Sequence, residues 1–366
     1  MFSGQIQHRI HYGQMGTDFK KMTRQMKLST QRLEYIDRLK GIAMLMVVIG
    51  HIIVFCGLGY ENTFVRHITM MNMPLFYFLS GLVLKDAYGI KNETKFRLYK
   101  SQQLLLPFFV WGGLMVLYRN ATYLDFIQNY WKFGYWYLIV LFEFIIFHII
   151  LNIINQLVNK KSKWWLDVCM FLCIWAGVRY AGKFIPERLN TIMDYWQFLA
   201  YLPFFYMGTF FRRYSLTDKM ISRSALTMTI LLLTLLPVYL LWKSEIFTSV
   251  TDIILPVNII LILLMIFCLY EKEIDGQSNR IFTIANLSGN IGKHTFSIYM
   301  MQFFLFRYIN FQDIFTSLYA SGNYLLILFI ASVTAVVLCY ICIFCESVIS
   351  KSRVLGYMLL GKRAQF

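Results

Sequence analysis

Charged residues are scarce in this chain. Only 15% of its 366 residues are Asp, Glu, Lys or Arg, whereas about 25% are charged in ordinary soluble domains. Hydrophobic residues make up 58% of the sequence, and the mean hydropathy is +0.55. Such a chain has too little polar surface for a water-soluble fold and too much apolar surface for a disordered one. The composition therefore predicts a polytopic membrane protein.

Acidic residues are the rarer of the two charge types. The chain has 19 Asp and Glu against 35 Lys and Arg, which gives a formal net charge of +16. In a soluble protein this excess would indicate a nucleic-acid partner, but membrane proteins collect Lys and Arg in their cytoplasmic segments. We therefore expect no nucleic-acid partner and use the basic residues to orient the chain.

Motifs of several other site classes are missing. The seven cysteines lie inside or at the ends of apolar stretches, which does not fit a disulfide framework. Cys339, Cys342 and Cys345 have no accompanying His or fourth Cys, so we expect helix packing rather than a metal site. The sequence also has no Walker loop, no dinucleotide-binding fingerprint and no inverted repeat of the transporter type.

Apolar runs of roughly 17–25 residues, long enough to cross a bilayer, dominate the chain. Ten such runs lie at 40–58, 69–85, 102–118, 135–157, 164–182, 196–212, 225–242, 251–270, 291–309 and 322–347. They predict an all-α bundle of about ten transmembrane helices. We expect the membrane domain at 34–347, between a polar basic N-terminal tail at 1–33 and a basic C-terminal tail at 348–366.

The distribution of basic residues orients these spans. With the N-terminus in the cytoplasm, 27 of the 35 Lys and Arg residues fall in cytoplasmic segments and 8 fall on the opposite side. This asymmetry follows the positive-inside rule and places both termini in the cytoplasm. We expect a multi-pass protein of a bacterial cytoplasmic membrane.

The most informative stretch runs from Tyr35 to His51 and places a histidine inside the first span. Ionisable groups at such depth usually face a cavity or a substrate path, although a neutral His satisfied by a neighbouring helix is the alternative. Lys40 precedes His51 by a helical turn of ~1100° and a rise of ~16–17 Å, so the two share a face. Arg38 lands roughly 140° away from His51, and Asp37 is placed to pair with Lys40.

A cation at the cytoplasmic mouth and a base half a bilayer deeper suit an elongated acyl carrier with an anionic head. Coenzyme A has that form. Lys40 would hold its phosphates, while the slender arm would bring the thioester close to His51. Neutral His51 would then remove a proton from an acceptor hydroxyl as the general base.

Further stretches along the chain carry a resemblance to a known family. They are Met73–Gly81, Leu105–Phe108, Trp136–Leu138, Pro203–Gly208 and Ser297–Met301. With Lys40 and His51, their order resembles the membrane-bound acyltransferase 3 family, in particular its sugar O-acetyltransferases, over residues 34–345. That family is marked by a basic residue, usually Arg, separated from a His by ten residues, and here Lys stands in place of Arg.

The resemblance implies a ten-helix domain that moves an acyl group, commonly acetyl, from cytoplasmic acetyl-CoA to an extracytoplasmic acceptor. The acceptor would be a hydroxyl of a glycan or lipid-linked saccharide, and acyl-CoA would be a donor substrate rather than a permanently bound cofactor. Asn72 and Gln302 stand where members often have His. Both can still hydrogen-bond to a substrate, but neither titrates, so acid–base work falls on His51.

Three other residues are candidate donor-binding groups. Ser80 lies in the second span beside Gly81, where a structural role in a helix kink is the alternative. Arg97 and Lys100 belong to a basic cluster before the third span. This cluster either binds coenzyme A phosphates or only orients the chain.

Candidate acceptor-binding groups lie toward the opposite side. Glu143 follows the Trp136–Leu138 stretch by about a turn and a half, and either binds the acceptor or pairs with a basic residue such as Arg179. Trp136 is a second candidate acceptor-binding residue. His67 lies at the extracytoplasmic edge of the second span, where a solvated turn is the alternative. The two remaining intramembrane or junctional histidines, His148 and His294, are expected to be structural.

Two other functions fit some of these features. A transporter or flippase of saccharide intermediates also suits ten spans and a membrane histidine. A non-catalytic scaffold in polysaccharide assembly would not need His51. The missing inverted repeat and the spacing between Lys40 and His51 favour the acyltransferase.

Overall fold

The computed structural model describes residues 34–59, 64–65, 69–84, 90–158, 163–243, 248–274 and 284–362. It describes side chains throughout these ranges except at 90–102, 155–158, 242, 248–251, 271–274 and 284–285. The described residues form helices, turns and loops and contain no strand, in agreement with the all-α prediction.

The helices follow one another with short connections. After the first helix (Glu34–Leu58) they are α3 (Asn72–Val83), α4 (Ile90–Arg119), α5 (Tyr123–Gln128), α6 (Trp136–Val158), α7 (Trp164–Ala181), α8 (Glu187–Ile192), α9 (Tyr195–Arg213), α10 (Leu216–Ser222), α11 (Ser224–Lys243), α12 (Thr248–Ile274), α13 (Ile284–Lys293), α14 (Thr295–Leu305), α15 (Gln312–Ala320), α16 (Tyr324–Ile349) and α17 (Arg353–Leu360).

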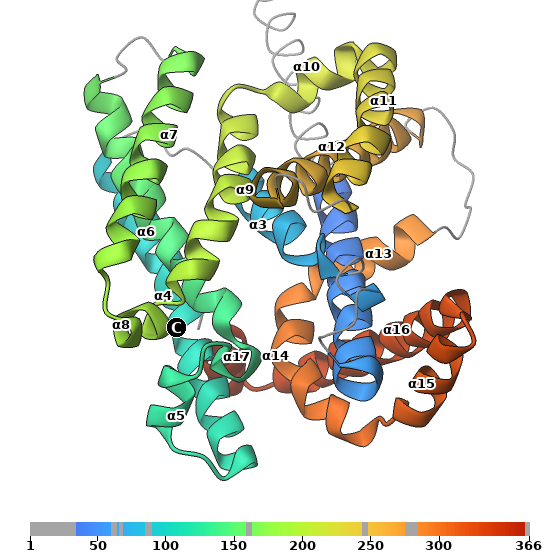
Figure 1. Cartoon of the computed structure of the whole chain (residues 1–366). Helices are drawn as coiled ribbons and strands as arrows, with labels where there is room; N and C mark the ends of the chain where they lie inside the picture. The colour runs from blue at the N-terminus through green and yellow to red at the C-terminus, as the bar shows by residue number, and fades with distance from the viewer. Residues whose placement is uncertain are drawn as a thin grey trace, which may run out of the picture.

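The chain is arranged around the first helix and α3. Figure 1 shows α6, α7 and α9, in green, on one side and α13 to α16, in orange and red, on the other. Between these groups, α3 packs along α9 and also contacts α12, which pairs with α11. The fold therefore brings helices from the beginning, middle and end of the chain against one another.

Glycines set the closest approaches between helices. At the Lys40 end of the first helix, a Cβ at Gly41 would overlap the carbonyl oxygen of Ser288 in α13. A Cβ at Gly292 of α13 would likewise overlap the carbonyl oxygen of Asp37. Small residues allow such contacts in membranes, where apolar lipid provides no hydrophobic drive for helix association. The first helix and α13 therefore pack backbone against backbone.

A second glycine pair joins α3 to α9. A Cβ at Gly81 would overlap the carbonyl oxygen of Phe205, and one at Gly208 would overlap that of Phe78. The two helices interlock reciprocally, since each glycine lies against the other helix's backbone. This contact gives the Met73–Gly81 and Pro203–Gly208 stretches a common structural role.

The apolar runs read from the sequence each overlap at least one helix. Within the described residues, six helical segments are long and apolar enough by themselves to cross a membrane, and the chain is thus an integral membrane protein. They are Glu34–Leu58, Trp136–Ile154, Trp164–Phe184, Ser224–Leu241, Asp252–Tyr270 and Tyr324–Ile349, with shorter apolar helices at Asn72–Val83 and Gln103–Arg119. The number of ten spans and the position of the termini stay predictions.

The run at 291–309 differs from the single span expected there. It divides between α13 and α14, which meet at His294, and it continues into a 3-10 turn at Phe306–Tyr308. Nδ1 of His294 lies 2.7 Å from Oε2 of Glu346 in α16. The helix is interrupted at a polar residue that is tied to another helix.

Replacing Gly81 by Ala should destabilise the protein, because the added methyl group meets the backbone of α9. Gly177→Ala in α7 is the matched control, since no atom lies within 4 Å of a Cβ built there. The control should gain roughly 0.5–1 kcal/mol from helix propensity. Thermal unfolding in detergent measures both variants, and equal stability of Gly81→Ala and the parent would contradict the interlocked contact.

Candidate active site

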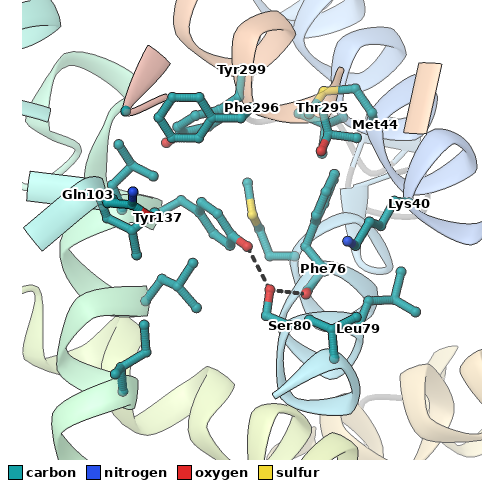
Figure 2. Close-up of a pocket in the computed structure, with 18 of the residues that line it drawn as sticks. Lys40, Met44, Phe76, Leu79, Ser80, Gln103, Tyr137, Thr295, Phe296 and Tyr299 are labelled. Atoms are coloured by element: carbon teal, nitrogen blue, oxygen red, sulfur yellow. Dashed lines mark hydrogen bonds between the residues drawn. The ribbon is translucent and has the colours of Figure 1, made fainter. Parts of the chain in front are cut away.

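A pocket of about 610 Å³ lies between the first helix, α3, α4, α6, α14 and the end of α17. Figure 2 shows Lys40 and Met44 of the first helix on one side, with Gln103 and Tyr137 facing them. Most of the described lining is apolar, and Lys40 is the one charged residue in it. The pocket thus combines a cation with a long apolar wall.

One stripe of the first helix lines this pocket. Lys40, Met44 and Val47 all face it, and His51 is the next residue on the same stripe, one turn beyond Val47. Arg38 points elsewhere: its guanidinium lies 3.7 Å from the carboxylate of Glu34 and 5.5 Å from the ring of Tyr270. Lys40 rather than Arg38 therefore faces the pocket, while His51 lies one turn beyond its lining in the described part of the chain.

His51 is half-buried among aromatic rings. The centroids of Phe303, Phe55 and Phe306 lie 5.1, 5.5 and 5.8 Å from that of its imidazole. The rings of Phe303 and Phe306 come from the segment that also carries Gln302. The histidine is thus held in an apolar setting with one polar neighbour on α14.

That polar neighbour is Gln302, which is fully buried. Its Oε1 lies 3.5 Å from Nδ1 of His51, and its Nε2 lies 3.5 Å from the carbonyl oxygen of Tyr299. Because the amide nitrogen is directed to a carbonyl, the amide oxygen faces the imidazole and accepts from Nδ1–H. Nε2 of His51 then keeps its lone pair, as a general base requires.

A pair of hydroxyl groups lies within the apolar wall. Ser80 donates to the carbonyl oxygen of Phe76 at 2.8 Å, and the hydroxyl oxygens of Ser80 and Tyr137 lie 3.0 Å apart. Tyr137 therefore donates to Ser80, as the dashed lines in Figure 2 trace. Both residues line the pocket, so they place polar atoms beside any ligand that fills it.

Tyr299 connects the pocket to the turn before α6. Its ring lines the pocket, and its hydroxyl donates to the carbonyl oxygen of Gly134. Gly134 has φ +108°, and a Cβ there would overlap the ring of Phe303, the neighbour of His51. Residues of α14 thus contact both the turn before α6 and His51, and Tyr299 of the same helix lines the pocket.

Outside the pocket a buried ion pair joins two turns. Nζ of Lys132 lies 3.1 Å from Oδ1 of Asp194. The same ammonium donates to the carbonyl oxygens of Asn129 and Thr191, at 3.0 and 2.7 Å. Burial lowers the pKa of Lys132, against the opposing charges of Asp194 and Glu143, and burial raises the pKa of Asp194 to about 7. Two buried charges are costly to desolvate, and the contact between them offsets part of that cost.

The backbone of these turns is unusual. Lys132, Phe133 and Asp194 have φ values of 45°, 52° and 47°, a region that residues other than glycine rarely adopt. Such conformations persist where surrounding contacts hold them and are frequent at functional sites. Here the ion pair supplies the contact between the two turns.

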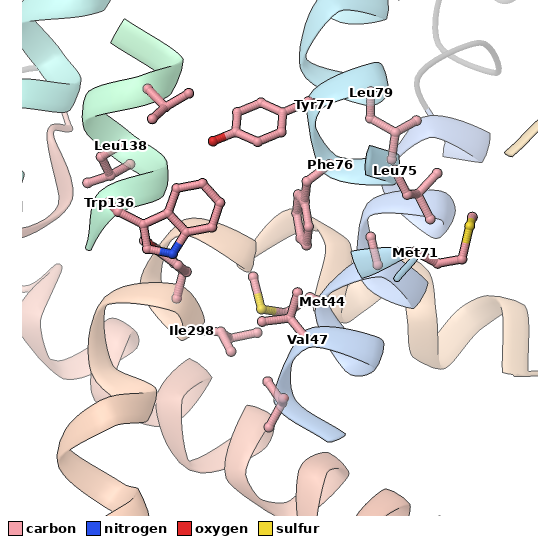
Figure 3. Close-up of a cluster of buried hydrophobic side chains, with 14 of the residues drawn as sticks. Met44, Val47, Met71, Leu75, Phe76, Tyr77, Leu79, Trp136, Leu138 and Ile298 are labelled. Carbon is pink, nitrogen blue, oxygen red and sulfur yellow. The ribbon is translucent and has the colours of Figure 1, made fainter. Parts of the chain in front are cut away.

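Trp136 belongs to a stack of buried aromatic rings rather than to the pocket lining. Its ring stacks on Tyr201 at 5.6 Å, and Tyr201 stacks on Tyr77 at 5.2 Å. Figure 3 shows Trp136, Tyr77 and Phe76 converging between α6 and α3. One face of the Trp136 indole, a candidate acceptor-binding group, is covered by Tyr201.

Glu143 does not form the ion pair with Arg179 that the sequence left open. Among the described side chains, the guanidinium of Arg179 lies over the ring of Trp175 at 5.9 Å. The charge of Glu143 acts to raise the pKa of Lys132, after the larger effects of burial and Asp194. It therefore lies within electrostatic range of the buried ion pair.

Asn72 ties α3 to the first helix. Its side chain is buried, and Nδ2 donates to the carbonyl oxygen of Met46 at 3.1 Å. Its Oδ1 is buried without a hydrogen-bond partner in the described part of the chain. A structural bond thus accounts for the amide nitrogen but not for the oxygen.

Several expected site residues cannot be compared with the structure. His67 lies outside the described residues, and Arg97 and Lys100 lie on α4 where side chains are not described. Asp37 is described in the first helix, one turn before Lys40, and its pairing with Lys40 stays a prediction. The roles assigned to these residues stay predictions.

The two histidines expected to be structural have neighbouring partners. Nε2 of His148 lies 3.3 Å from Nδ2 of Asn152, which is linked through Arg213 to the buried Asp167. His294 contacts Glu346. Neither lines the described pocket.

Sequence reasoning did not single out Tyr137, Tyr299, Lys132 or Asp194. Tyr137 and Tyr299 lie inside stretches that were quoted as matching motifs, so the signal was present but not resolved to one residue. Lys132 and Asp194 are 62 residues apart, and no local pattern pairs them. Only the contact between two turns reveals that ion pair.

Comparison with known proteins agrees with this geometry. Residues 33–344 match the acyltransferase domain of the acyltransferase 3 family. The chain belongs to this family. The match includes the first helix with Lys40 and His51 and every helix that lines the pocket except α17.

One curated relative is similar over a short segment. The nodulation protein NolL of Mesorhizobium japonicum is 32% identical over 93 residues, which is 24% of each chain. The similarity thus spans about a quarter of that protein's length. No solved structure matches the chain.

Asp194→Ala should destabilise the protein by about 3–5 kcal/mol, because it leaves the buried Lys132 ammonium without its carboxylate. Replacing both partners, as Lys132→Met with Asp194→Leu, should cost less than the single change. Asp313→Ala removes an exposed carboxylate of α15 and serves as the control. Thermal or denaturant unfolding in detergent measures the differences. If Asp194→Ala were as stable as the control, the stabilising role of the ion pair would be contradicted.

Proposed function

We propose that this acyltransferase family member is a membrane O-acyltransferase that moves an acyl group, most simply acetyl, from cytoplasmic acyl-CoA to a hydroxyl of an extracytoplasmic glycan or lipid-linked saccharide. One observation carries the proposal. Lys40, Met44 and Val47 line a single pocket, and His51 continues their stripe one turn deeper.

Donor binding is assigned to the Lys40 end of the pocket. Lys40, with Asp37 beside it, would hold the phosphates of coenzyme A, helped by Arg97 and Lys100 of α4. The slender arm would then lie along the apolar wall, where Ser80 offers a hydroxyl oxygen. This arrangement directs the thioester toward His51.

Transfer needs one base and one electrophile. Nε2 of His51 would take the proton of the acceptor hydroxyl as its oxygen attacks the thioester carbonyl carbon. The carbon–sulfur bond then breaks, and the proton passes from the imidazolium to the departing thiolate. The Gln302 amide oxygen, facing Nδ1, supports the tautomer that this step requires.

Acceptor binding is assigned to the opposite end of the helices. His67, Asn72, Glu143, Trp136 and Gln302 are the proposed contacts. The unpartnered Oδ1 of Asn72 and the position of Gln302 beside His51 support this assignment for two of them. Stacking on Trp136 would require Tyr201 to move from the indole face.

Opposite entry of donor and acceptor follows from the orientation. The charge distribution puts Lys40 on the cytoplasmic side, and His51 then lies roughly 16–17 Å deeper by helix rise. A transporter of saccharides would not need the alignment of Lys40 with His51. A scaffold would need neither residue. Transfer of label from acetyl-CoA to a glycan distinguishes the acyltransferase from both.

His51→Ala should lower transfer by about 10²-fold or more while leaving insertion unchanged, because the general base is lost. The test is glycan mass analysis of a strain lacking this protein and complemented with each variant. The parent and His148→Asn, which keeps a hydrogen-bonding group for Asn152, should restore the acetyl mass increment. Acetylation by His51→Ala within a few-fold of the parent would contradict the assignment of His51 as the general base.

Lys40→Ala should chiefly raise KM for acetyl-CoA, and Lys40→Arg should keep much of the affinity because the charge stays. Arg38→Ala is the matched control, since Arg38 is directed to Glu34 and Tyr270. Steady-state kinetics of purified protein in vesicles provide the measurement. An unchanged KM in Lys40→Ala would argue against phosphate binding there.

A further inference from the structure

The C-terminal segment contributes to the pocket although it lies beyond the family match. That match ends at residue 344, yet Leu360 and Gly361 line the pocket together with Gln103 and Leu104 of α4. Leu360 and Gly361 lie at the end of α17, which packs against α4. Figure 1 shows α17 turned back into the bundle. Part of the pocket is therefore built from residues outside the matched domain.

Glu346 joins this segment to a second part of the pocket. Its Oε1 accepts from Nζ of Lys362 at 2.8 Å, and its Oε2 lies 2.7 Å from Nδ1 of His294. Lys362 directly follows Gly361. His294 directly precedes Thr295, and both Gly361 and Thr295 line the pocket. One buried carboxylate thus holds two segments of the lining in register.

Other contacts hold α17 closely against α4. The indole Nε1 of Trp111 donates to the carbonyl oxygen of Leu359 at 2.8 Å. Gly361 has φ +61°, and a Cβ there would lie 2.6 Å from the carbonyl oxygen of Gln103. A side chain at this position would be strained and would push the segment away from α4. Nζ of Lys362 also lies 2.7 Å from the hydroxyl of Ser350.

We propose that residues 353–362 form a C-terminal wall of the donor pocket and that Glu346 and Lys362 position this wall for acyl-CoA binding. The identity of the ligand rests on the function proposed above. Leu360 and Gly361 would contact the donor, while Glu346 and Lys362 act through them as positioning residues. Loss of the wall opens the pocket and weakens donor binding without altering the chemistry at His51.

Accessibility of the pocket tests the wall independently of any ligand. Leu104→Cys places a thiol in the pocket lining, beside Gln103. Peptide mass spectrometry follows the labelling of this thiol by a maleimide in detergent. Lys362→Met should raise the labelling rate about fivefold or more, because the wall loses its anchor and opens locally. Lys362→Arg should keep the parent rate. Lys351→Met, which removes an exposed charge nearby, is the matched control.

Donor binding is the second measurement, made with acetyl-CoA. Lys362→Met should raise KM about tenfold while kcat changes less than about twofold, because only binding is weakened. Lys362→Arg should restore KM, which a general loss of stability would not predict. Gly361→Ala tests the same wall from its other contact and replaces Lys362→Met if that variant does not fold.

The possible results distinguish a failure of the proposed C-terminal wall from a failure of the proposed acyltransferase function. In the Leu104→Cys background, equal labelling of the introduced thiol with and without Lys362→Met or Gly361→Ala would overturn the proposal. A lower kcat with unchanged KM would overturn the positioning role. Faster labelling in a protein that neither binds nor turns over acetyl-CoA would support the wall and contradict the proposed function instead.

Discussion

The backbone of the first helix lies against that of α13 with no room for a methyl group at Gly41 or Gly292. This contact determines where α14 stands, because α14 follows α13 directly after His294. The residues of α14 that contact the candidate base, Gln302 and Phe303, are thereby held beside the first helix. In a membrane, close packing of small residues supplies the attraction that hydrophobic burial supplies in water.

Ionisable groups in the bundle are satisfied to very different degrees. The Lys132 ammonium has three oxygen partners within 3.1 Å, and Asp167 accepts from Arg213 and Tyr206 at 2.7 and 2.9 Å. Among the described side chains, His51 has one polar partner, Gln302, at the outer limit of hydrogen-bond distance. The Lys132 ammonium and the Asp167 carboxylate are thus each held by several short bonds, whereas the imidazole of His51 is held by one long contact among the described residues.

Aromatic residues separate the pocket from the turns on its far side. Tyr299 lines the pocket with its ring and reaches Gly134 with its hydroxyl. Tyr137 lies 5.5 Å from the same ring and bonds to Ser80. These two side chains therefore lie between the pocket and the turn before α6.

The sequence by itself determined the all-α membrane class, the family and the alignment of Lys40 with His51. Helix periodicity is local, so a spacing of 11 residues places two side chains on one face whatever else the chain does. Only the tertiary structure decided which residues pack against the face of the first helix that carries Lys40 and His51. The break at His294, the stack over Trp136 and the pairing of Lys132 with Asp194 join segments far apart in the sequence. Such contacts depend on how whole helices pack, and close packing leaves no periodic trace in a single chain.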